Sequence, residues 1–283
     1  MDFADLHIHT TASDGTLSPF EVANLACDSG LSVIAITDHD TVKGVAALAP
    51  HLPSGLKLVP GIEFSCLYSG NERFLLHILG YGFDYNHPAI LEAIDTAKQA
   101  RLKKHTLRIR YLKETFGIKF DKEEIEYLDT RPNVSKLHIA QLLHRRGMCL
   151  GIRDGLDKFM SSPDFPDGSI SAAVAIEAIK LSGGAAVYAH SLGGECDTRL
   201  SFAETAHRVK LLKQIGISGL ECYYSRYNEN EIEFLLSVAE REGLYVSGGS
   251  DFHGANKSTC LGNLSASGAR KQAGALTILD ILG

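Results

Sequence analysis

Short apolar segments alternate with amphipathic segments in two stretches of the chain, which lie before and after a middle region of different pattern. Near-continuous apolar runs are typical of strands buried on both faces, and they predict strands at residues 3–9, 31–37, 56–63, 74–81, 185–189, 217–222 and 244–248. Amphipathic spacing between the runs predicts helices at residues 18–29, 41–49, 171–181, 201–214 and 228–241. This alternation indicates an α/β fold, either a barrel or a wound parallel sheet.

The middle region has helical spacing of its apolar residues, which predicts a helix from about His87 and others at 121–129, 134–146 and 153–160. The turn-rich segment Ser161–Gly168 ends it. We therefore expect a β/α body formed by residues 1–84 plus 169–283 and an inserted small helical domain formed by residues 85–168. We assign no chemistry to residues 255–283, of which Gly274–Leu282 is expected to close the body as a strand or helix.

Composition excludes several classes of protein. Of the 283 residues, 45% are hydrophobic and 22% are charged, which is typical of globular domains and not of disordered chains. No apolar run reaches the roughly 18 residues that cross a bilayer, and no leader pattern is found, so we expect no membrane association. The six cysteines lie far apart without a CxxC pair, which favours a reducing cytoplasm over a disulfide framework.

Charge is divided unevenly between the two expected domains. The net charge is −6, which argues against a chain that is basic throughout and binds duplex nucleic acid. Residues 85–168 nevertheless carry 15 Lys and Arg against 12 Asp and Glu, and seven of the basic residues lie within Lys98–Lys113. The acidic body therefore suits multivalent cations, and the basic insertion suits an anionic ligand. A solvated helix face is the plainer explanation of the basic run.

Histidines and carboxylates follow the predicted strands, and most of them lie at the strands' carboxyl ends. They are His7, His9, Asp14, Asp38, His39, Asp40, Glu63, His77, His190, Asp251 and His253. In a β/α barrel these ends converge on one face, where active sites form. Each residue alone has a plainer explanation, such as a turn or a hydrogen-bonded core position. Their joint placement predicts a metal site.

The spacing of two pairs fits metal ligation. The side chains of His7 and His9 point to the same side of a strand because the period of a strand is two, and Asp251 and His253 repeat this spacing. Histidine and carboxylate ligands without thiolate suit Zn, Mn or Fe. A carboxylate such as Glu63 can bridge two cations, and a pair of cations about 4 Å apart serves phosphoryl displacement.

The order of these motifs resembles the polymerase-and-histidinol-phosphatase (PHP) family. The resemblance rests on Asp5-Leu-His-Ile-His-Thr, Ser13-Asp14-Gly15, Thr37-Asp38-His39, Gly61-Ile62-Glu63, Ala189-His190 and Gly249-Ser250-Asp251-Phe252-His253. It covers residues 1–84 and 170–255 and is closest to the stand-alone nucleotide phosphoesterase branch, which has an inserted helical domain. It implies that residues 1–84 and 169–283 form a catalytic domain with the fold of a distorted (β/α)7 barrel. Residues 85–168 would form a substrate-recognition cap.

The resemblance also implies two or three divalent metal ions (Zn, Mn or Fe) and the residues that hold them. One ion would be bound by His7, His9, Asp251 and a shared Glu63. A second would be bound by Glu63, His77 and His190, and a third by Asp14, His39 and His253. Asp251 and His190 would be catalytic together with Arg226, while Asp5 and Asp38 would orient imidazoles.

Substrate contacts are implied at two further places. Ser135, Lys136 and His138 correspond to a basic motif on an inserted helix, where Lys136 replaces a frequent arginine and loses its bidentate geometry. Arg226 corresponds to a phosphate clamp after a strand. Ser191 stands where the family usually has proline, which changes the loop and leaves the His190 ligand intact. Candidates for stacking on a base are Tyr224, Tyr227 and Phe116.

The expected function is a metal-dependent phosphoesterase that hydrolyses phosphomonoesters of nucleotides, such as 3',5'-bisphosphonucleotides, with a metal-activated water. A 5'–3' exonuclease on short 5'-phosphorylated oligonucleotides is the alternative within this class. A non-catalytic metal-binding regulatory module is disfavoured because all nine candidate ligands are present. An amidohydrolase would need a lysine ligand that the sequence lacks, and the insertion disfavours a histidinol-phosphate phosphatase. The expected partner is a small phosphorylated substrate. We expect the chain to be a monomer.

Overall fold

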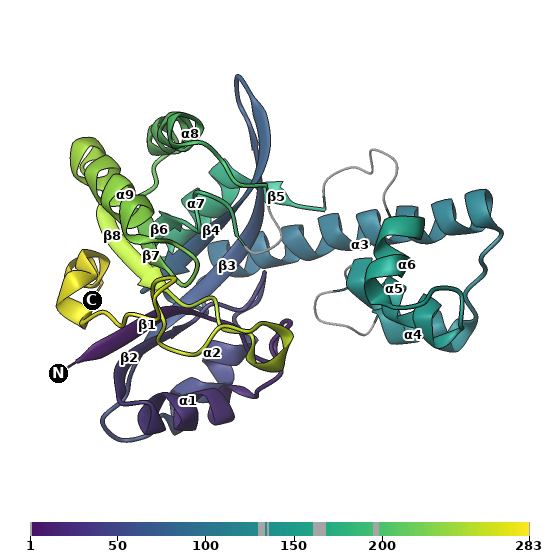
Figure 1. Cartoon of the computed structure of the whole chain (residues 1–283), viewed down its shortest axis with the longest axis horizontal. Coiled ribbons are helices and arrows are strands. Elements are labelled where there is room, and N and C mark those ends of the chain that lie inside the picture. Colours follow the sequence, from purple (N-terminus) through teal and green to yellow (C-terminus); the bar gives the residue numbers. More distant parts are fainter. Residues whose placement is uncertain (1, 130–133, 135, 161–167, 195–197, 283) are drawn as a thin grey trace. The chain divides into compact units, whose positions relative to one another are not determined.

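The computed structural model describes residues 2–129, 134, 136–160, 168–194 and 198–282 (Figure 1). The chain divides into two compact units. We call the first unit, Met1–Ile94 with Ile170–Gly283, the body, and the second unit, Asp95–Ser169, the insert. Helix α3 (Pro88–Phe116) begins in the body and supplies the first helix of the insert. The two units are described separately.

The body is built on one mixed β-sheet. Its strands are β1 (Phe3–Ile8), β2 (Leu31–Ile36), β3 (Lys57–Ser69), β4 (Arg73–Tyr81), β5 (Ile170–Ser171), β6 (Ala185–Tyr188), β7 (Gly219–Tyr224) and β8 (Tyr245–Gly249). Their order is β1-β2-β3-β4-β6-β7-β8, with β5 beside β3. Neighbours are parallel, except that β4 runs antiparallel to both β3 and β6. The predicted α/β alternation is confirmed, whereas the reversed direction of β4 is a feature that the pattern does not reveal.

The two ends of this sheet meet. The backbone N–H of His9 donates to the carbonyl of Phe252 at 2.9 Å, and that of Asp251 donates to the carbonyl of His7 at 2.8 Å. Ile8 and Phe252 form a parallel bridge. The first strand and the segment after the last strand are therefore side by side, as a distorted seven-stranded barrel requires.

Five helices of the body follow strands at the predicted places. They are α1 (Pro19–Asp28), α2 (Lys43–Leu48), α7 (Ala172–Leu181), α8 (Phe202–Gln214) and α9 (Glu229–Glu242). Capping boxes begin three of them, with Ser18, Ser201 and Asn228 as the cap residues. The closing segment is neither a strand nor an α-helix, because 3-10 turns occupy Ala273–Ala275 and Thr277–Ile281.

Two apolar clusters hold the body together. One lies among the strands and includes Leu6, Leu79 and Val187, and the hydroxyl of the buried Tyr81 donates to the Leu6 carbonyl at 2.8 Å. The other joins α1 and α2 to β1 and β2, with Ile34 among its fully buried members (Figure 1). Burying apolar surface on both faces of the strands contributes about 25 cal/mol per Å² to folding and fixes the ends of the strands in place.

The insert has its own apolar core. Besides α3 it contains α4 (Lys122–Asp129), α5 (Lys136–Arg145) and α6 (Ile152–Phe159). Leu112, Leu128, Leu143 and Phe159 pack together in it. Within the described ranges, no helix has both the length and the apolar character needed to cross a membrane.

Candidate metal centre

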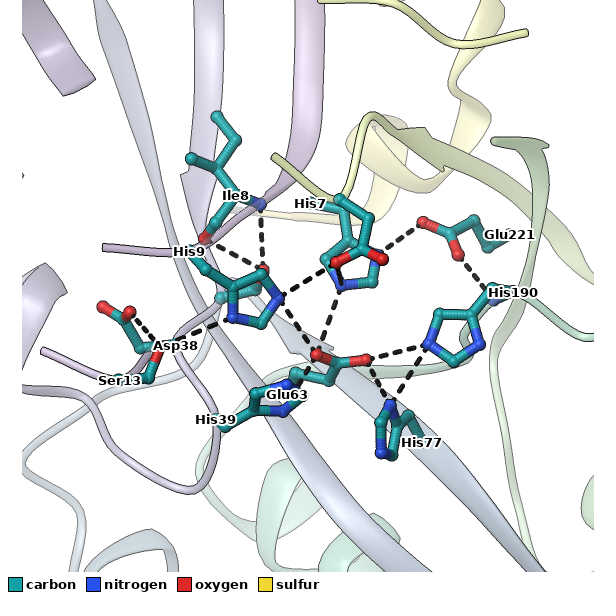
Figure 2. A network of polar contacts seen from close by, with 12 residues as sticks. His7, Ile8, His9, Ser13, Asp38, His39, Glu63, His77, His190 and Glu221 are labelled. Carbon is teal, nitrogen blue, oxygen red and sulfur yellow. Dashed lines mark hydrogen bonds and ion pairs between the residues drawn. The ribbon is translucent and has the colours of Figure 1, made fainter. Parts of the chain in front are cut away.

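The carboxylate of Glu63 is the centre of a network of imidazoles (Figure 2). Its Oε1 lies 2.8 Å from Nδ1 of His77 and 3.2 Å from Nε2 of His190. Its Oε2 lies 3.3 Å from Nε2 of His7 and 3.1 Å from Nε2 of His9. One oxygen therefore faces β4 and the loop after β6, and the other faces β1, as expected of a carboxylate that bridges two cations.

The sequence pattern predicts Glu63 at the end of its strand, but in the structure the strand continues past this residue. β3 continues to Ser69 and pairs with β4 as a long antiparallel hairpin, in which Glu63 is opposite Leu79. His77 is opposite Ser65 in the same hairpin. The reversal of β4 thus explains how a histidine inside a strand reaches the same centre as residues at strand ends.

Asp251 forms a second carboxylate of the centre, and its two oxygens have different surroundings. Oδ1 lies 3.6 Å from Nε2 of His7 and 3.4 Å from Nε2 of His9. Oδ2 accepts from the hydroxyl of Tyr224 at 3.0 Å and from Nζ of Lys257 at 2.6 Å. The carboxylate therefore points one oxygen at the histidines and has the other held by side chains.

Asp14 gathers the remaining histidines. Its Oδ1 lies 3.3 Å from Nε2 of His253 and 3.6 Å from Nδ1 of His9, and its Oδ2 lies 3.8 Å from Nε2 of His39. His39 also turns its Nδ1 to Glu63 Oε2, at 3.1 Å. All nine residues proposed as ligands from the sequence thus lie in this one network.

Three subsets have the spacing of a metal site, with potential ligand atoms all within 4.8 Å of one another. They are His7, His9 and Glu63, then His39, Glu63 and His77, and finally His9, Asp14, His39 and His253. The sets overlap at Glu63, His9 and His39. This overlap is what a cluster of neighbouring cations needs.

Backbone conformation is unusual at the same place. His190 and Asp251 have φ angles of 26° and 58°, in the left-handed region that side chains other than glycine rarely adopt. The His190 N–H donates to Oε2 of Glu221 at 2.5 Å, and the Asp251 N–H donates to the His7 carbonyl at 2.8 Å. Strain of this kind persists where the surroundings impose it, and it gathers at functional sites.

Glu221 belongs to the site and was missed by sequence reasoning. It is fully buried in β7, and its Oε1 lies 2.8 Å from Nδ1 of His7 (Figure 2). The contact fixes the ring so that Nε2 faces Glu63 and Asp251, which is how outer carboxylates orient metal-binding histidines. The available signal was a lone acidic residue inside the otherwise apolar strand predicted at 217–222.

Within the described residues, Asp5 and Asp38 make no direct bond to an imidazole, and Asp38 reaches His9 only through the hydroxyl of Ser13, which lies 3.5 Å from Nδ1 of His9. Asp5 accepts from the backbone N–H groups of His7, Ser250 and Gly262 and from the Ser250 hydroxyl. Asp38 accepts from the hydroxyl and backbone N–H of Thr10 and from the hydroxyl of Ser13. Both carboxylates therefore hold the loops that present the ligands. Glu221, in contrast, contacts an imidazole directly.

Opposite charges at the centre shift the pKa values of its groups. Burial disfavours the protonated form of His9, but Asp251, Glu63 and Asp14 outweigh burial and raise its pKa to about 9. The pKa of His7 is likewise well above its usual value, because Glu221, Glu63 and Asp251 outweigh burial. Burial would raise the pKa of Glu63, yet the surrounding histidines hold it well below its usual range. The chain alone thus favours protonated imidazoles at His7 and His9 and an ionised carboxylate at Glu63.

The donor set fits divalent metal ions. Nε2 of His7, Nε2 of His9 and Oε2 of Glu63 are buried and make no hydrogen bond to any group that the structure describes. Buried polar atoms are otherwise almost always hydrogen-bonded, so converging atoms of this kind indicate a missing ligand. Imidazole and carboxylate donors suit Zn, Mn and Fe.

The residues proposed to contact substrate are spread over both units. Ser135 lies outside the described residues. Lys136 is exposed and His138 half-buried on α5 of the insert, whereas Arg226 is an exposed residue of the body. Arg226 lines a polar cavity of about 300 Å³ together with Ser225, Ser258, Thr259, Cys260, Asn263, Ser265, Ala266 and Gly268.

The structure contradicts base stacking by two of the three aromatic candidates. Tyr224 and Tyr227 are buried, and their hydroxyls bond to Asp251 Oδ2 and to the backbone N–H of Leu192. The sequence did not reveal this burial, because the strand continues two residues past the predicted run and ends at Tyr224. Phe116 is exposed and contacts Phe159 edge-on within the insert.

Comparisons with known proteins identify a family model, curated relatives and a solved structure that are similar to this chain. The PHP domain model matches residues 5–143. The chain is 30% identical over 255 residues to the 5'-3' exoribonuclease Rnm of Escherichia coli, covering 88% of this chain and 84% of that protein. It is also 30% identical over 255 residues to the 3',5'-nucleoside bisphosphate phosphatase of Chromobacterium violaceum, covering 88% and 86%. A crystal structure of a metal-dependent phosphoesterase from Bifidobacterium adolescentis superposes with a TM-score of 0.77 at 27% identity, covering 99% of this chain and 96% of that one.

Proposed function

The chain belongs to the PHP domain family, and we propose that it is a metal-dependent hydrolase that removes phosphate from phosphomonoesters of nucleotides, 3',5'-bisphosphonucleotides among them. One observation carries the proposal. Glu63 faces His77 and His190 with one oxygen and His7 and His9 with the other. A bridging carboxylate with imidazoles on both sides is the ligand arrangement of phosphoesterases that use neighbouring cations.

We assign the metal ions to the nine residues of the network. His7, His9 and Asp251 would hold one ion and share Glu63 with a second, which His77 and His190 complete. Asp14, His39 and His253 would hold a third. Zn, Mn and Fe all suit these donors. Bound there, such cations supply charge that stabilises the phosphoryl oxygens and the leaving oxygen and acidify a water that attacks phosphorus.

The chain's own groups then have defined tasks. Asp251 holds one oxygen toward His7 and His9 while Tyr224 and Lys257 hold the other, so its orientation is set before substrate arrives. Preorganised charge of this kind is the main means by which phosphoryl transfer is catalysed. The chemistry requires no serine or cysteine nucleophile, so we expect no covalent intermediate.

We propose that Arg226 and the insert recognise the anionic parts of the substrate. Arg226 lines a polar cavity with hydroxyl and amide side chains, which suits a phosphate or a ribose. The insert carries the basic residues of Lys98–Lys113 and presents Lys136 and His138 on α5. A substrate with more than one phosphate suits this basic charge, and we propose the role of a recognition cap for the insert.

We further propose that the protein works as a monomer in the cytoplasm. Five cysteines fall within the described residues, and all five are free thiols (Cys27, Cys66, Cys149, Cys222 and Cys260). Free thiols, some of them exposed, suit a reducing compartment.

The proposal is tested by the products formed from two substrates. We expect the manganese-loaded protein to release inorganic phosphate from adenosine 3',5'-bisphosphate, and Glu63→Gln to lose this activity. A Glu240→Gln variant, changed at an exposed residue of α9, should keep it. A matched assay uses a 5'-phosphorylated RNA pentamer. Release of mononucleotides from the pentamer without phosphate release from the bisphosphate would favour the exonuclease named among its relatives instead.

A further inference from the structure

Lys257 places its ammonium group at the edge of the proposed metal centre. It follows the 3-10 turn Gly254–Asn256 that comes after β8. Only 21% of its side chain is exposed, and its Nζ lies 2.6 Å from Oδ2 of Asp251. The sequence reasoning did not single it out, because the pattern showed only a lysine in a loop past the last strand.

Lys257 lies on the opposite edge of Asp251 from the histidines. Oδ1 of Asp251 faces His7 and His9 at 3.6 and 3.4 Å. Oδ2 is the oxygen that Lys257 and Tyr224 hold. A cation bound at the histidines through Oδ1 would therefore leave the contact between Lys257 and Oδ2 in place. The carboxylate of Asp251 would then have one positive charge on each side.

The ammonium group has donors to spare. A lysine side chain carries three N–H donors and no acceptor. In the part of the chain that the structure describes, Asp251 is the single partner of Lys257 Nζ. Two N–H groups thus have no protein acceptor among the described residues and can donate to another group. An oxygen-rich anion at the centre would satisfy them.

We propose that Lys257 binds a non-bridging oxygen of the phosphoryl group that the centre cleaves. This inference rests on the proposed phosphoesterase function and adds a substrate-contacting residue to it. The ammonium contributes a positive charge from the protein itself on the side of Asp251 away from the histidines. The Asp251 contact keeps the flexible lysine stem in one position, so little conformational freedom is lost when phosphate binds.

A purely positioning role for Lys257 predicts different results from a phosphate-binding role. Tyr224 provides the comparison, because its hydroxyl holds the same Oδ2 atom and donates its single hydrogen to it. If Lys257 acted only through Asp251, Lys257→Met and Tyr224→Phe would change the protein in the same way. Both would lower metal occupancy, and neither would weaken phosphate binding once the metals were restored.

The test measures phosphate binding and metal content separately. Inorganic phosphate is titrated calorimetrically into the manganese-loaded wild-type protein and into Lys257→Met, Lys257→Arg, Tyr224→Phe and the exposed-lysine control Lys210→Met. Metal content is measured by mass spectrometry on the same samples. We expect Lys257→Met to bind phosphate about 10- to 100-fold more weakly at full metal occupancy, the range for a hydrogen bond between charged groups. Lys257→Arg should recover part of the affinity, and Tyr224→Phe and Lys210→Met should match wild type.

Three results would overturn the inference. They are unchanged phosphate affinity in Lys257→Met at full occupancy, equal weakening in Tyr224→Phe, and a loss of metal from Lys257→Met that added manganese does not restore. Because the titration needs no turnover, it is independent of the substrate assay. A chain that binds phosphate through Lys257 yet hydrolyses no nucleotide would refute the proposed substrate and leave this assignment standing.

Discussion

Nδ1 of His7 lies 2.8 Å from Oε1 of Glu221, and both side chains are completely buried. The contact determines which nitrogen of His7 is available, since Nε2 is left facing Glu63 and Asp251. The other oxygen of Glu221 accepts from the backbone N–H of His190. One carboxylate thus positions two histidines that are assigned to different metal ions.

Replacing Glu221 should therefore weaken metal binding without removing a ligand. We expect Glu221→Gln to lower the affinity for manganese about 10- to 100-fold, the usual cost of losing an outer-sphere carboxylate. Metal content after gel filtration, followed by chelator competition, measures this. Glu233→Gln, at an exposed position of α9, is the matched control. Excess metal should restore activity to the variant, and normal metal affinity in Glu221→Gln would refute its positioning role.

Metal affinity should rise with pH. The pKa of His9 is raised to about 9 in the metal-free protein, because Asp251, Glu63 and Asp14 outweigh the opposing effect of burial. An imidazole must be neutral to bind a metal, so below pH 9 binding has to displace this proton. The apparent affinity should increase about tenfold for each pH unit between pH 6 and 8 for each proton released. Calorimetry in buffers of different ionisation enthalpy counts the protons, and a count of zero would contradict the assignment of His9.

Asp5 should be important for stability. Its carboxylate accepts from backbone N–H groups of His7, Ser250 and Gly262, so it ties β1 to the segments after β8. Asp5→Asn puts an amide N–H₂ group against one of these donors, and we expect the free energy of unfolding to fall by about 1–3 kcal/mol. Urea unfolding of the metal-free protein measures the change. Asp2 is exposed and directly precedes the same strand. Asp2→Asn should change the free energy of unfolding by less than about 0.5 kcal/mol.

Arg226 should affect substrate binding more than turnover. It lies outside the network of histidines and lines the polar cavity of about 300 Å³. We expect Arg226→Ala to raise KM for adenosine 3',5'-bisphosphate about 10-fold or more, because a charge-assisted phosphate contact is lost. The change in kcat should be smaller. Arg241→Ala, at an exposed position of α9, is the control. Unchanged KM in Arg226→Ala would remove this arginine from the substrate site.

Much of the fold was predictable because its signals are local. Apolar runs such as 31–37 and capping boxes such as that of Ser18 and Glu21 act within a few residues, and the structure confirms the elements they predicted. The membership of the PHP family was predicted from short motifs and is confirmed. Motifs such as His7-x-His9 are readable because strand geometry alone places their side chains on one side.

Features that depend on distant pairing were not predictable. The antiparallel direction of β4 and the length of β3 follow from their pairing with each other and with β6. Glu221 is 214 residues away from His7 in the chain, so no local pattern connects them. The hydroxyl of the buried Tyr224 likewise donates to Asp251, which lies 27 residues further along the chain, after the next strand. Side-chain type indicated the chemistry, and the topology decided which groups meet.

The most direct test of the central claim couples metal content to phosphate release. Metal is removed from the wild-type protein with a chelator, and manganese is added back stepwise while bound metal per chain and phosphate released from adenosine 3',5'-bisphosphate are measured together. We expect no phosphate release without metal and a recovery that follows the occupancy of the site. In Asp251→Ala we expect reduced metal content and no recovery of activity. Phosphate release that persists in the metal-free protein, or full metal content and activity in Asp251→Ala, would contradict the central claim.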